Sequence, residues 1–350
     1  FISNGIYFCY CICICQIFIN IQLQYLAKQD DDSSMATKET KASEAVEYHS
    51  KDFEWETLRH EIEGNPTYRY HVVSVNGDLP REQRDECIDR KDLFQEESRA
   101  WERFHQRHSS GKFFKERRYL LMEFPELATC ENVSLLEVGC GAGSSVIPIL
   151  RSNKNVAVYA CDCSAEILAK LKEFVKDSDI MGVGDRFYTF QCDFSSSGFP
   201  SWLKTNSGLE TCQDALKDCD ISENHSSFKG LDFVSLIFTL SAVPLKKMQY
   251  AINECYSVLK PGGLLFFRDY GLYDWSMLRF ESHKKVGFRE YMRSDGTRSY
   301  FFCLETVRNL FSAAGFEEVE LEFCCVNSAN RRKCQSMKRV WVHGKFRRPT

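Results

Sequence analysis

The sequence predicts an α/β fold in which a mostly parallel sheet carries helices on both faces. Apolar segments of strand length alternate with segments of helical periodicity, which is the order expected of βαβ units. Acidic residues recur at the ends of these apolar segments, with Asp162, Asp193 and Asp269 each ending or following one. Because the carboxyl ends of parallel strands meet at one edge of a sheet, this order predicts a ligand site there.

The first predicted strand runs into a glycine turn. Glu137 stands in this apolar run, and Gly139, Gly141 and Gly143 alternate after it. The spacing is G-x-G-x-G, unlike the G-x-G-x-x-G of dinucleotide oxidoreductases, so no pyrophosphate cradle is implied. A carboxylate beside the turn would repel a phosphate and favours a ligand with a cationic end. S-adenosylmethionine, which carries an ammonium and a sulfonium, is such a ligand, although a plain strand–helix connection also fits the turn.

The next two strands end in acids that suit a nucleoside. The strand predicted over Val156–Cys161 leads to Asp162, whose carboxylate can accept hydrogen bonds from both ribose hydroxyls. The strand predicted over Phe187–Cys192 leads to Asp193 and Phe194, which are placed to bind an adenine amine and cover its ring. Each acid taken singly would serve equally well as a helix cap.

Further strands are predicted over Leu231–Phe238 and Leu264–Arg268. The connection over 195–230 is longer than most in compact domains and is interpreted as a surface insertion. After Asp269-Tyr270-Gly271 a long irregular segment is expected up to Arg298.

The C-terminal part is expected to complete the sheet. A helix over Leu304–Ala314 ends at Gly315, a typical left-handed stop. Strands over Glu317–Cys324 and Val340–His343 follow it. Upstream of the sheet, a charged helix is expected over 81–108.

Composition limits the function classes. At 350 residues and a net charge of −4, the chain is not a globally basic nucleic-acid binder, so contact with RNA requires a local patch. Its 17 cysteines form no C-x-x-C pair, so no metal site is predicted. Four of them, Cys140, Cys161, Cys163 and Cys192, lie at strand ends and turns predicted to be buried and are interpreted as small apolar fillers in a reducing compartment. Association with DNA or with a membrane is not expected.

Two basic segments suit a nucleic acid. Phe113–Arg118 places two aromatic residues beside three cations, the combination that stacks on unpaired bases and neutralises phosphates. From Phe323 onward the chain has lysine and arginine but no aspartate or glutamate. A solvated surface would explain either segment equally well.

These motifs resemble a known family. Glu-Val-Gly-Cys-Gly-Ala-Gly with Leu-Lys-Pro-Gly-Gly is similar to class I S-adenosylmethionine-dependent methyltransferases, which implies a Rossmann-like, mostly parallel seven-stranded sheet. Other segments resemble the tRNA N3-methylcytidine methyltransferase family more narrowly, within a match from about Trp101 to Phe346. These segments are 113–118, 159–162, 236–243, 268–274 and 295–302.

The resemblance implies S-adenosylmethionine as cofactor and extends its site. The positions that match Trp101 and His105 line the methionine end in the family, which usually has tyrosine where His105 stands. An imidazole can still donate one hydrogen bond there. The predicted cofactor-binding residues are Trp101, His105, Glu137, Gly139, Gly141, Gly143, Asp162, Asp193, Phe194 and Ile237.

The implied activity is methylation of cytidine N3 at position 32 of a tRNA anticodon loop, a reaction of the 2.1.1 transferase class. Asp269 is the candidate to stabilise the developing positive charge and to select cytosine; the alternative is that it pairs with Arg268 or Arg298. Arg117 and Phe114 complete the predicted catalytic set. The predicted RNA-binding residues are Phe113, Lys115, Arg118, Tyr270, Arg293, Arg298 and Arg332.

Composition along the chain, together with the resemblance, suggests its organisation. Residues 1–34 are expected to be an apolar leader outside the fold, with a membrane anchor as the less favoured alternative, and 35–50 to be disordered. Residues 51–130 are expected to cover cofactor and RNA, and 131–348 to form the methyltransferase domain. One branch of the family works with a seryl-tRNA synthetase, which makes that enzyme a candidate partner. The expected location is the cytoplasm, with the nucleus as a second one.

Two alternatives remain open at the level of sequence. A methyltransferase for a small molecule or a protein would share the fold. A non-catalytic tRNA-binding adaptor would have a decayed cofactor pocket, against which the intact acids and glycines argue.

Overall fold

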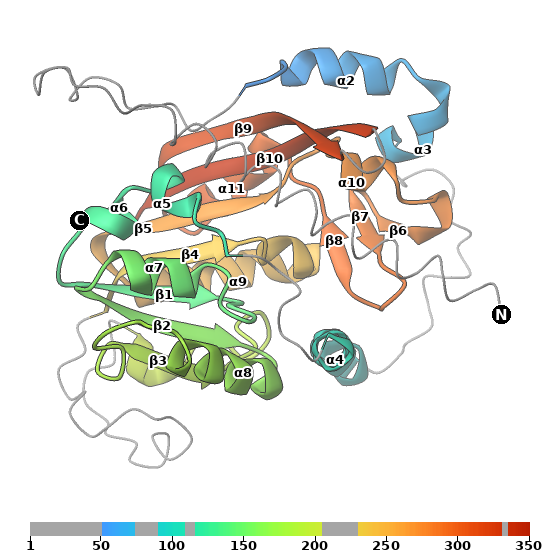
Figure 1. Ribbon diagram of the computed structural model, residues 1–350. Coiled ribbons are helices and arrows are strands. Elements are labelled where there is room, and N and C mark those ends of the chain that lie inside the picture. Colours follow the sequence, from blue (N-terminus) through green and yellow to red (C-terminus); the bar gives the residue numbers. More distant parts are fainter. Residues whose placement is uncertain (1–50, 74–89, 109–115, 205–229, 331–334) are drawn as a thin grey trace, which may run out of the picture.

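The computed structural model describes residues 51–73, 90–108, 116–204, 230–330 and 335–350 (Figure 1). The predictions for the leader, for the disordered segment and for most of the insertion over 195–230 lie outside these residues. Within the described part of the chain, no helix has the length and apolar character needed to cross a membrane.

A seven-stranded sheet in the order β3-β2-β1-β4-β5-β10-β9 forms the centre of the molecule. Strands β1 to β5 pair in parallel, whereas β10 runs antiparallel to both β5 and β9. The predicted Rossmann-like fold is therefore confirmed. The strands are β1 Val133–Val138, β2 Val156–Asp162, β3 Phe187–Gln191, β4 Leu231–Ile237, β5 Leu259–Tyr270, β9 Glu317–Asn330 and β10 Gln335–Arg347.

Strand β5 begins earlier than the sequence predicts. Leu259 already pairs with Leu231, and the register then shifts so that Leu264 faces Phe233. The Pro-Gly-Gly sequence between them is accommodated as an irregularity within the strand rather than as a turn before it, since the extra residues need no partner on β4.

Helices cover both faces of the sheet. On one face α9 (Leu245–Val258) and α11 (Leu304–Ala313) pack in a large apolar cluster with residues such as Met248 and Phe311. On the other face α7 (Val146–Ser152) and α8 (Ala165–Lys176) pack in a second cluster. The short helices α5 (Leu120–Glu123) and α6 (Glu126–Thr129) belong to that second face.

The segment between β5 and α11 (Leu304–Ala313), which the sequence predicts to be irregular, is instead ordered. It contains the one-turn helix α10 (Trp275–Leu278), the 3₁₀ turn η6 (Ser282–Lys284) and a separate three-stranded antiparallel sheet. Strands of three residues are too short to show an alternating pattern, so the sequence could not reveal them. The strands of this small sheet are β6 Lys285–Gly287, β7 Glu290–Met292 and β8 Arg298–Tyr300.

The N-terminal extension packs on the elements from α10 to β8, which together form the added region. Helices α2 (Trp55–Glu63) and α3 (Arg69–Val72), joined by η1 (Pro66–Tyr68), share an apolar cluster with α10 and β7. Trp55 stacks on Phe323 of β9 with 4.7 Å between ring centroids.

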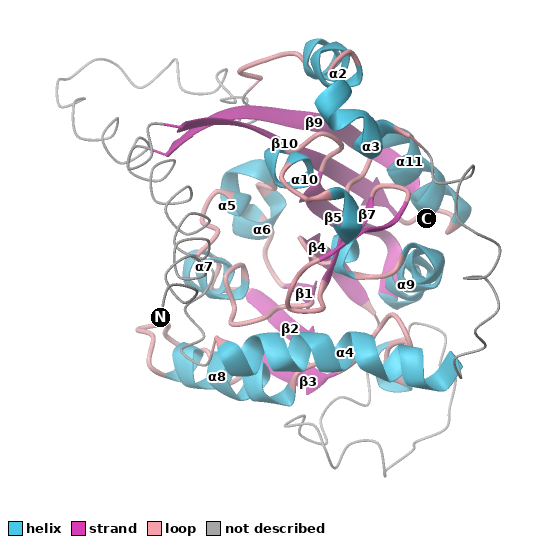
Figure 2. Cartoon of the chain, turned by 90° about the vertical axis from the view of Figure 1, so that its right-hand side faces the viewer, coloured by secondary structure: helices cyan, strands magenta, loops and turns pink. Residues whose placement is uncertain are grey.

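Helix α4 (Arg90–Arg107) lies across the end of the main sheet, beside α8 (Figure 2). Phe104 and His105 of α4 are both buried, as expected of a helix that packs one face on the domain.

A network of buried charges lies under α5. Glu123 pairs with Arg268 of β5 and also accepts from His343 Nδ1 of β10 at 3.0 Å. His343 Nε2 in turn lies 2.9 Å from Glu320 of β9. Arg298, the other arginine considered as a partner for Asp269, pairs with Glu290 at 3.1 Å. Neither arginine therefore pairs with Asp269, contrary to the alternative considered from the sequence.

Candidate functional site

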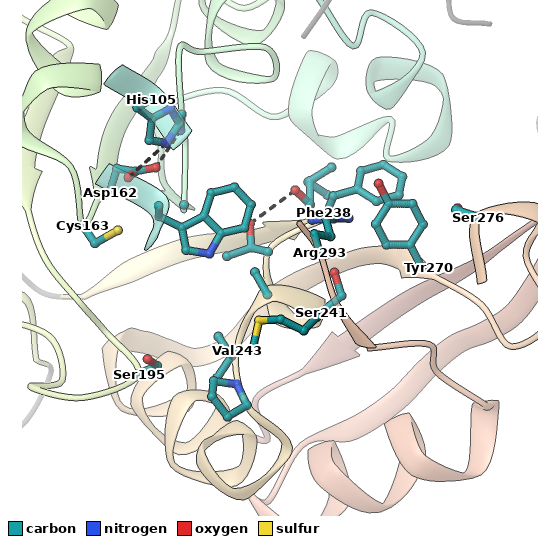
Figure 3. A pocket seen from close by; sticks show the side chains of 18 of the residues that line it. His105, Asp162, Cys163, Ser195, Phe238, Ser241, Val243, Tyr270, Ser276 and Arg293 are labelled. Atoms are coloured by element: carbon teal, nitrogen blue, oxygen red, sulfur yellow. Dashed lines mark hydrogen bonds and ion pairs between the residues drawn. The ribbon is translucent and has the colours of Figure 1, made fainter. Parts of the chain in front are cut away.

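A cavity of about 980 Å³ lies where the carboxyl ends of β1 to β5 meet α4 and the added region. Figure 3 shows it as an elongated space, with His105, Asp162 and Cys163 at one end and Phe238, Tyr270 and Ser276 at the other. The predicted residues that line it are Trp101, His105, Arg117, Gly139, Gly141, Asp162, Asp193, Phe194, Ile237, Tyr270 and Arg293.

The glycine turn forms one wall of the cavity. A Cβ at Gly139, where φ is +66°, would lie 2.6 Å from Thr239 Cγ2, so only glycine fits. At Gly141 a Cβ would meet nothing within 4 Å, which leaves the backbone open to a ligand. Gly143 does not line the cavity; its Cβ would lie 2.4 Å from Leu171 Cδ1 of α8. Its role is therefore close packing of the turn rather than cofactor contact.

Asp162 organises the turn from the end of β2. Its carboxylate accepts from Gly141 N at 3.0 Å and from Ser164 N at 3.1 Å. His105 Nε2 of α4 lies 4.0 Å from the same carboxylate. Burial lowers the pKa of His105 although Asp162 opposes the shift, so a neutral imidazole that can donate one hydrogen bond is favoured at neutral pH.

Asp193 ties helix α4 to the end of β3. It accepts from Ser98 Oγ at 2.6 Å and from Ser195 Oγ at 2.8 Å. Burial raises the pKa of Asp193, but these hydrogen bonds outweigh it and the net pKa is lowered. A charged carboxylate is thus held beside Phe194, the arrangement expected for an adenine amine and ring.

Glu137 is not at the cavity wall, which corrects the expectation that it meets the cofactor directly. It is 1% exposed, and Ser235 Oγ of β4 donates to its carboxylate. Burial raises its pKa to about 7, against a hydrogen bond from Ser235 and the nearby charge of Arg117. Glu137 therefore supports the turn from below.

Asp269 is likewise buried beneath the cavity. It is 0% exposed and accepts from the backbone N–H groups of Ser241 and Tyr270, both at 2.8 Å. Burial raises its pKa to about 6. Asp269, predicted to touch the substrate base, does not line the cavity in this arrangement; its carboxylate instead binds the backbone of Ser241 and Tyr270, which both line it.

The other end of the cavity is aromatic and cationic. The guanidinium of Arg117 lies 5.3 Å from the ring centroid of Phe238, and its Nη1 donates to Ser145 Oγ at 3.2 Å. The rings of Phe238 and Tyr270 are 5.1 Å apart. Phe238 has a φ of +56°, a strained conformation for a phenylalanine that places its ring at the wall and is typical of functional sites.

Several predicted RNA-binding residues lie elsewhere. Arg118 pairs with Glu116 at 2.9 Å and Arg298 with Glu290, and neither lines the cavity. In the basic C-terminal segment, Lys345 pairs with Glu126 and Glu320, both at 2.9 Å. Phe113, Phe114, Lys115 and Arg332 lie outside the described residues.

Many residues that line the second end of the cavity, beside Phe238 and Tyr270, were not predicted from the sequence. The walls of this end come from the loop after β4, from α10 and β7, and from β10. These elements are far apart in the sequence, and no periodic pattern in the sequence predicts that they meet. The adjacent aromatic and basic residues of this region were the available signal. The missed lining residues include Phe238, Thr239, Ser241, Trp275, Ser276, Arg279, Met292, Arg339 and Trp341.

The first end fits a sulfonium nucleoside. It combines the open backbone at Gly141, two carboxylates on adjacent strands, and aromatic residues on α4 and after β3. Asp162 would hold the ribose, Asp193 and Phe194 the adenine, and Trp101 with His105 the methionine end.

This fit yields a prediction. Asp162→Ala is expected to weaken S-adenosylmethionine binding, measured by calorimetry, about 10- to 100-fold because a charge-assisted acceptor is lost. Asp162→Asn should retain part of the affinity. Asp232→Ala is the matched control, since Asp232 is bound by Ser134 and Lys260 away from the cavity. Unchanged affinity in Asp162→Ala would mean that this carboxylate does not hold the ribose.

Comparison with known proteins identifies the family. The chain is 37% identical over 262 residues to "tRNA N(3)-cytidine methyltransferase METTL6" of Homo sapiens, covering 73% of this chain and 82% of that protein. The chain belongs to the tRNA N3-methylcytidine methyltransferase family. The methyltransferase is also 31% identical to "tRNA N(3)-cytidine methyltransferase METTL2" of Danio rerio, with 84% of each chain covered. Residues 91–321 match the family model described as "Methyltransferase domain".

Solved structures are similar to this chain at low identity. A SAM-dependent methyltransferase from Methanosarcina mazei is 16% identical, with a TM-score of 0.44, and 63% of this methyltransferase and 95% of that chain are covered. As a member of its family, the methyltransferase uses S-adenosylmethionine as its methyl donor.

Proposed function

We propose that this methyltransferase methylates N3 of a cytidine in the anticodon loop of tRNA, at position 32. The observation that carries the proposal is that one cavity joins the nucleoside-binding end to an end lined by Arg117, Phe238 and Tyr270. Its relatives named as tRNA N(3)-cytidine methyltransferases support the choice of substrate.

The chain needs to do little acid–base chemistry for this reaction. S-adenosylmethionine, when bound, supplies an electrophilic methyl group, and neutral cytosine N3 already has a lone pair. The residues therefore contribute mainly by orienting the base and by excluding water. Because N3 is hidden in a paired or stacked base, the nucleotide must be extruded from the loop. Phe238 and Tyr270 would flank the extruded ring, whose faces tolerate stacking on aromatic side chains.

Arg117 is placed to orient the extruded nucleotide. Its charge lies near the buried carboxyl groups of Glu137 and Asp269, both of which it influences electrostatically. A guanidinium held in this way would donate to cytosine O2 or to the phosphate. Arg293, which also lines the cavity, is a second donor of the same kind.

We propose a partner and a location on separate grounds. A seryl-tRNA synthetase would select the tRNAs, which follows from the family branch that works with one. The cytoplasm, with the nucleus as a second location, is favoured because the nine cysteines that the structure describes are free thiols, as in a reducing compartment.

The proposed function is tested by labelled methyl transfer. The full chain is incubated with labelled S-adenosylmethionine and bulk tRNA, and the nucleosides are analysed by mass spectrometry. We expect N3-methylcytidine, absent from a transcript in which C32 is replaced by uridine. Label in protein or small molecules but not in tRNA would contradict the proposal. Binding of tRNA with no methylation and no cofactor heat would indicate an adaptor instead.

A further inference from the structure

The cavity continues beyond the pair of rings proposed to hold the target base. Its volume of about 980 Å³ is at the upper limit of the roughly 300–1,000 Å³ typical of a single small-ligand site. Past Tyr270 the wall is formed by Trp275, Ser276 and Arg279 of the α10 region and by Met292 of β7. This end therefore has room and side chains that neither the cofactor nor one base would use.

Helix α10 is held rigidly although it is a single turn. Asp274, its N-cap, is 0% exposed and accepts from Ser276 N at 2.8 Å. The same residue accepts from Arg339 Nε at 2.8 Å and from Val340 N at 2.9 Å, both on β10. A buried carboxylate with these donors fixes the turn to the main sheet, and with it the direction of the residues that follow.

Trp275 is an aromatic residue without a structural partner. Within the described part of the chain it is half-buried, stacks on no other ring, and its indole N–H donates to no acceptor. Trp55 differs, because it stacks on Phe323 and donates to the Leu272 carbonyl at 3.1 Å. A tryptophan used for packing resembles Trp55; Trp275 instead presents indole surface to the cavity.

A cation accompanies Trp275 on the same face of α10. Arg279, the C-cap, retains helical φ and ψ and follows Trp275 by four residues, so the two side chains project from one side of the turn. Lys284 and Arg293 also line this end, together with one carboxylate, Glu281. An aromatic face beside several cations matches a base with its phosphate better than it matches an apolar or cationic ligand.

We propose that Trp275 and Arg279 form a second nucleotide subsite. It takes the nucleotide adjacent to the target cytidine in the RNA, with the neighbouring base stacked on the Trp275 indole and its phosphate beside Arg279. The inference rests on the proposed function, since extrusion of the target base moves its neighbour toward the same cavity.

The subsite is tested with an anticodon stem-loop RNA that carries 4-thiouridine on the 5′ or the 3′ side of the target cytidine. With the wild-type chain we expect one of the two RNAs to crosslink, on irradiation, to the peptide that contains residues 275–279. Trp275→Ala should remove that crosslink and weaken RNA binding, measured by fluorescence anisotropy, about 10-fold, the cost of one base–aromatic stack. Affinity for S-adenosylmethionine should not change.

Two further variants separate stacking from loss of folding. Trp275→Phe should restore most of the RNA affinity, because an aromatic face is retained. Tyr250→Ala is the matched control: Tyr250 is 42% exposed on α9 and outside the cavity, and RNA affinity should stay at the wild-type value.

Each possible result is decisive. Wild-type-like RNA binding by Trp275→Ala, or crosslinks that map elsewhere for both RNAs, would overturn the subsite while wild-type methylation of tRNA still supports the function. Equal weakening in Trp275→Ala and Trp275→Phe would also overturn it, because stacking would not be the cause. A wild-type chain that neither binds nor methylates tRNA would overturn the proposed function and the subsite together.

Discussion

Replacing Arg117 with alanine is expected to lower methyl transfer to tRNA about 100-fold or more. The guanidinium lines the aromatic end of the cavity and lies over Phe238, where the extruded base is proposed to bind. Losing one preorganised donor in such a site typically costs about 10²–10³ in rate. Single-turnover kinetics with labelled cofactor would measure the change, and S-adenosylmethionine affinity should stay within a few-fold of the wild type.

The adjacent arginine provides the control. Arg118 is exposed, pairs with Glu116 and does not line the cavity, so Arg118→Ala should change the rate little. Arg117→Lys should recover only part of the rate, since an ammonium cannot reproduce the planar fork of a guanidinium. Equal losses in Arg117→Ala and Arg118→Ala would show that a general loss of positive charge, not a positioned donor, was being measured.

Most of the sheet could be predicted from the sequence because its signals are local. Apolar runs between helical segments indicate strands, and acids such as Asp162 and Asp193 mark the strand ends that face the cavity. The glycine turn could be placed because Gly139, Gly141 and Gly143 alternate directly after the apolar run. These features are set by residues near one another in the chain.

Side-chain direction at the site could not be predicted in the same way. Glu137 and Asp269 occupy the predicted positions in the chain, yet both point beneath the cavity because Ser235 and the Ser241 backbone provide donors there. Nor could the sequence place Phe238 at the wall, since its orientation depends on a strained left-handed φ. The direction of these side chains depends on partners that are far away in the sequence.

The buried charges under α5 are expected to contribute strongly to the stability of the fold. Glu123→Ala is expected to lower the free energy of unfolding by about 3–5 kcal/mol, the usual cost of removing one partner from a buried ion pair. Glu123 has no exposed side-chain surface, and its loss leaves Arg268 and His343 buried without their shared carboxylate. Urea unfolding of the full chain would measure the change. Glu116→Ala, which breaks pairs that are partly exposed, should cost no more than about 1 kcal/mol.

The pH dependence distinguishes this electrostatic cause from a simple cavity. Burial alone would lower the pKa of His343, but hydrogen bonds to Glu123 and Glu320 outweigh it and raise the pKa above the ordinary 6.5. The stabilisation from the imidazolium is therefore complete below pH 6.5 and is lost as the pH rises through the folded-state pKa. In Glu123→Ala the Arg268 charge faces His343 without the intervening carboxylate, so this loss on raising the pH should shrink. An unchanged pH dependence in the variant would show that Glu123 acts by packing rather than by charge.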